Sequence, residues 1–179
     1  IIDTTVQEKN VTYPTDGKLA IKMIHQLLRI AKKEQIQLRR TYMKEIKMHR
    51  ISLRFFRHPK KIKKARAAMK RLKTIVGILM RDISRHLSTE QLDKYQETFE
   101  LFEKVTKQQM KDSNKIYSLH EQHIYVIAKG KDHKKYEYGT KASLVTTMKS
   151  NVIVGVVAHE KNEHDSKTLE AALASANKH

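Results

Sequence analysis

Apolar residues recur at helical spacing through the middle of the chain. From Gly17 to the His58-Pro59 pair they fall mostly three or four residues apart, which predicts one long helix capped by Asp16. Pro59 would end that helix, because the residue before a proline disfavours the helical conformation. The positions that carry the pattern are Ile24, Leu27, Leu28, Ala31, Leu38, Tyr42, Ile46, Leu53 and Phe56.

Two further apolar stripes predict two more helices. The second consists of Ile62, Ala65, Met69, Leu72, Val76, Leu79 and Ile83. The third begins where Ser88 and Gln91 fit a capping box and Leu87 with Leu92 fits a hydrophobic staple. Its stripe consists of Leu92, Tyr95, Phe99, Phe102, Thr106 and Met110, at coiled-coil-like steps. We expect the three helices to pack together, with the aromatic residues in the core rather than against a cofactor.

Strand-like patterns lie on both sides of this helical segment. Residues 1–6 have the pattern of a strand, 124–127 form a short β-like run, and 136–147 and 152–159 predict two further strands. Asp165 or Ser166 would cap a final helix. The predicted order is strand, long helical segment, two strands and helix, which is a mixed α/β class and α+β by content.

The charge of the chain is strongly positive and unevenly distributed. The 179 residues include 37 Lys and Arg against 19 Asp and Glu, for a formal net charge of +18. Nineteen of the basic residues lie between Arg29 and Arg81, where the acids are Glu34 and Glu45. Such a surface attracts polyanions, chiefly nucleic acid. A ribosome-like or simply soluble basic protein is the alternative.

Other compositional features narrow the class of protein. Cysteine is absent, which excludes disulfides and thiolate metal sites and is compatible with a reducing cytoplasm. There is no apolar run of roughly 20 residues and no signal peptide, so we expect no membrane association. Predicted elements begin at Ile1 and continue almost to His179, and we therefore expect the sequence to be a piece of a longer protein.

Three local motifs have ordinary structural explanations. Lys129-Gly130-Lys131 lacks the spacing of a P-loop, and either a grip on a phosphate backbone or a solvated loop would account for it. His159, His164 and Asp165 lack a specific ligand spacing, which favours a polar connection over a metal site. The sequence gives no indication of a Ser, His and Asp set for nucleophilic catalysis. Such a set is recognised by its spatial arrangement, which separation along the sequence does not reveal.

Asp3 is a carboxylate inside an apolar strand pattern. In a sheet core such a group is costly unless it is paired or binds a cation, and a rigid oxygen ligand suits Mg²⁺. An exposed position near the end of a strand would explain it equally well. The residues alone leave both interpretations open.

Three ordered blocks resemble bacterial insertion-sequence transposases of the DDE type. The run from Ile2 to Asp16, IDTTVQEKNVTYPTD, is similar to the first catalytic motif of that group. The runs 127–131 and 133–141 look like a second block, and 164–169 looks like a third. The helical middle is similar mainly in its position and its basic character.

The resemblance implies an RNase H-like fold. Residues 1–16 and 116–179 would form part of the catalytic core (strand, strand, strand, helix), and residues 17–115 would be a basic helical insertion after the first strand. It also implies DNA cleavage and joining by phosphoryl transfer, with Asp3 as the first of three acids that hold Mg²⁺ or Mn²⁺. The expected partners are double-stranded DNA and a second copy of the protein, in the bacterial cytoplasm at the nucleoid.

Basic residues are candidates for contact with the DNA backbone, a hypothesis that rests on the charge imbalance. They are Arg39, Arg40, Lys60, Lys61, Lys63, Lys64, Lys70 and Arg71 in the helical segment, and Lys129, Lys131, Lys134 and Lys135 in the later basic loop.

The sequence also departs from the family pattern. The second Asp and the Glu of the family have no counterpart in residues 1–179, so we expect this chain by itself to be inactive. Two alternatives stay open: a basic helical nucleic-acid-binding module without chemistry, and an inactive remnant of a transposase.

Overall fold

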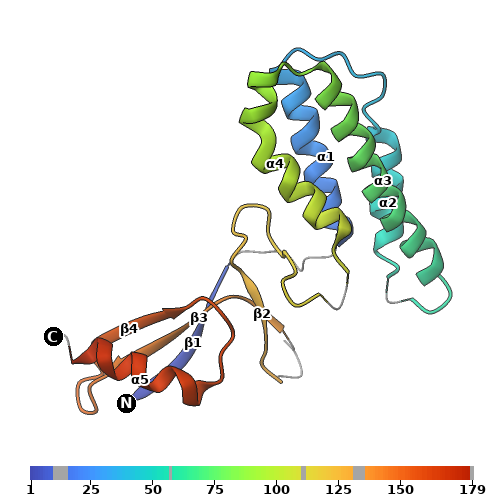
Figure 1. Cartoon of the computed structure of the whole chain (residues 1–179). Coiled ribbons are helices and arrows are strands. Elements are labelled where there is room, and N and C mark those ends of the chain that lie inside the picture. The colour runs from blue at the N-terminus through green and yellow to red at the C-terminus, as the bar shows by residue number, and fades with distance from the viewer. Residues whose placement is uncertain (10–15, 57, 110–111, 131–135, 178–179) are drawn as a thin grey trace. The chain divides into compact units, whose positions relative to one another are not determined.

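The structure, a computed structural model, describes residues 1–9, 16–56, 58–109, 112–130 and 136–177. The chain divides into two compact units (Figure 1). Residues 1–12 and 116–179 form the sheet unit, and residues 13–115 form the helical unit. The predicted boundaries, after residues 16 and 115, fall close to these.

The helical unit has four described helices that bury one face each. They are α1 (Asp16–Lys33), α2 (Met43–Leu53), α3 (Ile62–His86) and α4 (Thr89–Lys107). Helix α3 packs against all the others, and α1 also contacts α2 and α4. The predicted apolar stripes supply much of the core, including Ile24, Leu27, Leu72, Leu79, Ile83 and Phe102. Met23 and Ile75 are also fully buried, although the predicted stripes do not include them.

The prediction of one long first helix is wrong. The chain leaves the helix after Lys33 and enters α2 at Met43, and both Gln35 (φ 55°) and Tyr42 (φ 58°) adopt the left-handed conformation. The apolar spacing runs on through this break, so periodicity alone does not reveal it. Tertiary packing decides it, because the turn lets α2 return and bury Ile46 to 3% exposure.

The start of α4 confirms the predicted capping box. The Gln91 amide donates to the Ser88 hydroxyl oxygen at 3.3 Å, and the Ser88 amide donates to the Gln91 side chain at 3.0 Å. Tyr95 and Phe102 lie in the core as expected, whereas Phe99 is only half-buried, and the stripe ends with α4 at Lys107. Met110, the last predicted member of that stripe, lies outside the described residues.

Asp16 is the first residue of α1, and its carboxylate links three parts of the helical unit. It forms ion pairs with Lys115 at 2.9 Å and Lys73 at 3.6 Å. It also accepts a hydrogen bond from the Gln108 side chain at 3.2 Å. The sequence predicts only a cap at this position, whereas the structure gives Asp16 a tertiary role.

The sheet unit is an antiparallel sheet with one helix. Its elements are β1 (Ile2–Glu8), β2 (Tyr125–Ala128), β3 (Tyr136–Thr146), β4 (Ile153–His159) and α5 (Asp165–Ala176). Strand β3 is central and pairs antiparallel with each of the others. Strand β1 lies along one edge of β3, while β2 and β4 share the other edge, because Gly139 pairs with both Glu8 and Tyr125. The mixed class is confirmed as α+β.

The sheet has one covered face and one open face. Residues directly opposite in antiparallel strands point to the same side. Gly155 faces α5, since a Cβ there would lie 3.0 Å from the Ala176 amide nitrogen. Side chains along a strand alternate between the two faces, so the pairing of the strands places Thr4, Ser143 and Val157 on the same face as Gly155. Helix α5 covers this face. The open face carries Asp3, Leu144 and Val156.

Candidate functional site

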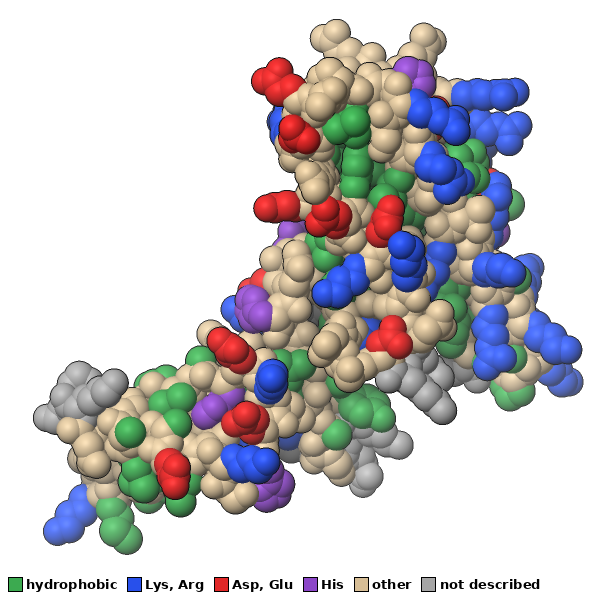
Figure 2. All heavy atoms as spheres, viewed as in Figure 1, with side chains coloured by type: hydrophobic (Ala, Val, Ile, Leu, Met, Phe, Trp, Pro, Cys, Tyr) green, Lys and Arg blue, Asp and Glu red, His purple; other side chains and the backbone are tan. Residues whose placement is uncertain are grey.

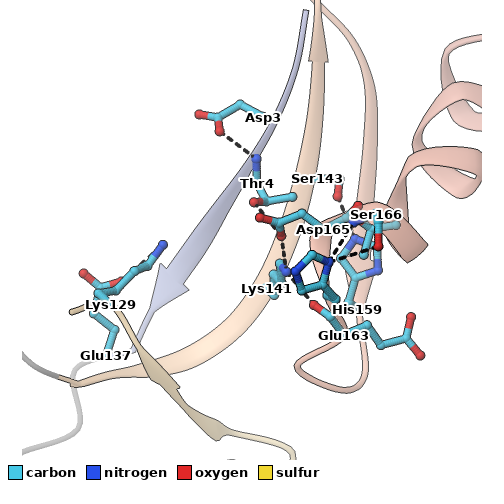
Figure 3. Close-up of polar contacts among 12 residues, drawn as sticks. Asp3, Thr4, Lys129, Glu137, Lys141, Ser143, His159, Glu163, Asp165 and Ser166 are labelled. Atoms are coloured by element: carbon cyan, nitrogen blue, oxygen red, sulfur yellow. Dashed lines mark hydrogen bonds and ion pairs between the residues drawn. The ribbon is translucent and has the colours of Figure 1, made fainter.

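Asp3 lies on the open face of β1 and is exposed. Figure 3 shows its carboxylate turned away from the polar groups under α5, and one of its oxygens accepts a hydrogen bond from the Thr4 amide at 2.8 Å. The carboxylate is therefore not buried in a sheet core, so no cation is needed to offset a cost of burial. Asp3 instead presents its carboxylate to solvent from a strand that is paired along its length with β3.

The described surroundings of Asp3 supply no complete set of metal ligands. Within the described part of the chain, no three His, Cys, Asp or Glu side chains come close enough together to hold a metal ion. The assignment of Asp3 as a metal ligand stays a prediction.

The covered face carries a polar cluster at the start of α5. The Lys141 side chain, in a residue only 8% exposed, forms an ion pair with Asp165 and donates to the Glu163 carbonyl oxygen at 2.6 Å. The Thr4 hydroxyl donates to the same Asp165 carboxylate at 3.0 Å (Figure 3). These bonds join β1, β3 and α5 around a cavity of about 350 Å³ that Lys129 and His164 also line.

The Lys141–Asp165 pair is best explained as a structural clamp. Hydrogen bonds from Lys141, and then from Thr4, lower the pKa of Asp165, so the carboxylate stays charged near neutral pH. A buried ammonium group needs such a partner. The helix cap itself is His164, whose ring nitrogen accepts from the Ser166 amide at 3.4 Å, so the predicted cap at Asp165 or Ser166 is one or two residues late.

The fold also brings together Ser143 and His159, which the sequence does not connect. The Ser143 hydroxyl lies 2.8 Å from His159 Nε2. Ser143 is fully buried under α5. A serine nucleophile must reach its substrate, so this pair supports packing rather than catalysis. His159, His164 and Asp165 make separate contacts, as a polar connection would.

The helical unit is basic on one side. Figure 2 shows Lys and Arg side chains crowded over α2 and α3, while acidic side chains gather over α4. The exposed acids of α4 are Glu90, Asp93, Glu97, Glu100 and Glu103. The positive charge that the sequence places in this segment therefore forms a directional surface.

The predicted DNA-contact residues fall into three groups. Exposed residues with side chains available to a ligand are Arg39, Arg40, Lys60, Lys63, Lys64 and Lys70. Others already contact the protein: Arg71 donates to both oxygens of Glu45, Lys129 pairs with Glu137 at 3.9 Å, and the Lys61 ammonium lies 4.4 Å from the centre of the Phe55 ring. Lys131, Lys134 and Lys135 lie outside the described residues.

Among the predicted DNA-contact residues, Arg71 makes a two-point contact with a carboxylate of the protein. Its hydrogen bonds to Glu45 measure 2.6 and 3.4 Å, and they raise the pKa of Arg71 and lower that of Glu45. Its main role in the structure is to fix α2 against α3.

Two arginines that the sequence analysis did not single out, Arg81 and Arg85, lie with Arg39 and Arg40 around one groove. Their four-residue spacing on α3 is the signal that could have identified them.

No protein-family model and no solved structure matches the chain. A 57-residue segment, 32% of this chain, is 40% identical to an uncharacterized protein, ORF8 in the nfe locus of Rhizobium meliloti. The match spans 28% of that protein's length, so it does not establish a family. None of the described helices is long and apolar enough to cross a membrane.

Proposed function

We propose that the chain is part of a DDE-type insertion-sequence transposase that cuts and joins DNA by phosphoryl transfer. The observation that carries this proposal is the position of Asp3, which stands in the family-like first motif with its carboxylate exposed on the first strand. The strand order β1-β3-β4 followed by α5 supports it, because an RNase H-like core begins with three strands and a helix.

The residues of the sheet unit fit one part of a metal site. Asp3 would hold Mg²⁺ or Mn²⁺ through a hard carboxylate oxygen. A complete site of this kind would hold two cations, one to lower the pKa of an attacking water or 3′-hydroxyl and one to stabilise the leaving oxygen. Pairing of β1 along β3, and the clamp under α5, would keep the Asp3 backbone rigid.

The helical unit would hold the DNA. Its exposed cations over α2 and α3 would contact the phosphate backbone of insertion-sequence ends or target, in a homodimer on DNA. Phosphate contacts of this kind position the duplex without reading its sequence.

Asp3→Asn in the complete gene product tests the catalytic role. The amide keeps the size of the side chain and loses the negative charge that a divalent cation requires. We expect Mg²⁺-dependent strand cleavage to fall to background while DNA affinity is unchanged, measured on a labelled duplex that carries the element's ends. Glu170→Gln, which removes an exposed carboxylate from α5, is the matched control and should cleave normally. Normal cleavage by Asp3→Asn would refute the assignment.

A second candidate function is a nucleic-acid-binding module without catalysis. The crowding of basic side chains over α2 and α3 favours it, as does the lack, among the described residues, of a group of three ligating side chains that includes Asp3. The two proposals differ in what the gene encodes after residue 179. An Asp after a new apolar strand, and a later Glu on a helix, would support the transposase. Cleavage assays of the complete product separate an active enzyme from an inactive remnant.

A further inference from the structure

The helical unit contains a groove whose lining is dominated by arginine. It has a volume of about 490 Å³. Its lining consists of Arg39, Arg40, Tyr42, Ile78, Arg81, Asp82 and Arg85. All four arginines are exposed, and they come from two segments separated by about 40 residues of chain.

Local structure explains how the four arginines meet. On α3, Ile78, Arg81 and Arg85 follow one another at three- and four-residue steps and so share one face of the helix. Arg81 and Arg85 are separated by roughly 6 Å along the helix axis, at 1.5 Å per residue. Arg39 and Arg40 come from the segment between α1 and α2, which the left-handed residues Gln35 and Tyr42 turn out of the helical path.

The groove carries an excess of positive charge, since its described lining holds four arginines and one acid. Among the described residues, none of the four guanidinium groups forms an ion pair with a carboxylate, in contrast to Arg71 with Glu45. The one acid in the lining, Asp82, lies 4.0 Å from His86 on its own helix. Like charges one helical turn apart destabilise a helix, so a cluster of this kind is relieved by a bound anion.

We propose that this groove binds the phosphodiester backbone of duplex DNA. Each guanidinium presents a planar set of N–H donors that matches the oxygens of a phosphate group, and its charge persists at any physiological pH. Four such groups around one hollow provide donors from both of its walls. The choice of DNA as the ligand rests on the proposed function above, whereas the phosphate chemistry rests on the groove alone.

The test compares two pairs of substitutions that remove the same charge from the whole chain. Arg81→Gln with Arg85→Gln changes the groove, and Lys104→Gln with Lys107→Gln changes exposed positions on α4. Binding to a short fluorescent duplex is measured by anisotropy over a range of salt concentrations. Each lost phosphate contact should reduce the salt slope by about 0.9, so we expect the groove pair to lose about two units of slope and roughly tenfold or more in affinity at 0.1 M salt.

The outcomes separate this inference from the proposed function. Equal slopes for both pairs of variants would refute the groove, while DNA binding through the lysines at the start of α3 could still stand. A wild-type chain without salt-dependent DNA binding would refute both. If the groove variant lost binding to anionic phosphatidylserine vesicles but kept its duplex affinity, a membrane would replace DNA as the ligand. Should Arg81→Gln with Arg85→Gln unfold the chain, Arg39→Gln with Arg40→Gln tests the same groove from its other wall.

Discussion

At the residue scale, Glu34 shows how one carboxylate can fasten two helices. It follows the end of α1, and its side chain is only 10% exposed. The Gln91 side chain donates to one oxygen at 2.7 Å, and Lys94 at 2.9 Å and the Tyr95 hydroxyl donate to the other. These hydrogen bonds lower the pKa of Glu34 to about 2, and the bond from Tyr95 has the largest effect. The charged form of Glu34 therefore ties α1 to α4.

This cluster predicts a loss of stability in acid. Because the pKa of Glu34 falls from 4.5 in the unfolded chain to about 2 in the folded one, its contribution is complete above pH 4.5 and disappears as the pH falls towards 2. Glu34→Gln should lower the denaturation midpoint at pH 6 and differ less from wild type at pH 2.5. Glu97→Gln, an exposed acid on α4, is the control and should change neither midpoint. A constant difference between Glu34→Gln and wild type from pH 6 to 2.5 would contradict the explanation.

At the element scale, the sheet depends on close pairing of β1 with β3. Gly139 sits opposite Glu8 on one edge and Tyr125 on the other, so two strands meet β3 at this residue. A Cβ at Gly139 would lie 2.1 Å from the Gln7 carbonyl oxygen, which belongs to backbone and cannot rotate away. The glycine is needed for the approach of β1, and β1 carries Asp3.

Gly139→Ala should therefore destabilise the sheet unit. We expect the free energy of unfolding to fall by roughly 1–3 kcal/mol, the range for overpacking of a tight site, measured by urea denaturation of the whole chain. Gly77→Ala on α3 is the matched control. A Cβ at Gly77 would meet only the Arg81 guanidinium, at 3.4 Å, and the helix should gain up to about 1 kcal/mol. Unchanged stability of Gly139→Ala would show that β1 can shift away from β3.

At the scale of the whole molecule, most of the excess of positive charge belongs to α2, α3 and the segment that leads into α2. Most basic residues of α2 and α3 are exposed, while the five exposed acids of α4 lie on another helix of that unit. A field with this asymmetry orients a polyanion as well as attracting it. We therefore expect the exposed lysines at the start of α3 to contribute together to DNA binding.

Charge reversal at the start of α3 tests this surface. Lys60→Glu, Lys63→Glu and Lys64→Glu leave Lys61 on the Phe55 ring and remove three exposed cations. We expect weaker duplex binding and a salt slope smaller by about 3, from about 0.9 per phosphate contact. Reversal of Lys22, Lys32 and Lys33, exposed on α1, changes the net charge equally and should alter the slope less. The same slope in both triple variants would argue against a directional surface.

Local features of the chain were predictable because neighbouring residues produce them. The capping box of Ser88 and Gln91 needs only a hydroxyl and an amide three residues apart. Strands β3 and β4 begin and end within one residue of the predicted limits, since their alternating patterns are local. The helical stripes and the basic character of the middle segment follow from the order of residues for the same reason.

Other features depended on residues far apart in the sequence. The left-handed turns at Gln35 and Tyr42 form because α2 packs back on α3, although the apolar spacing continues. The Lys141–Asp165 clamp and the arginine groove join segments that only folding brings together. For Asp3, the sequence by itself determined a carboxylate on an apolar strand within a family-like motif. Only the tertiary structure decided that this carboxylate is exposed, because the face of the sheet that α5 covers is set by packing around Gly155.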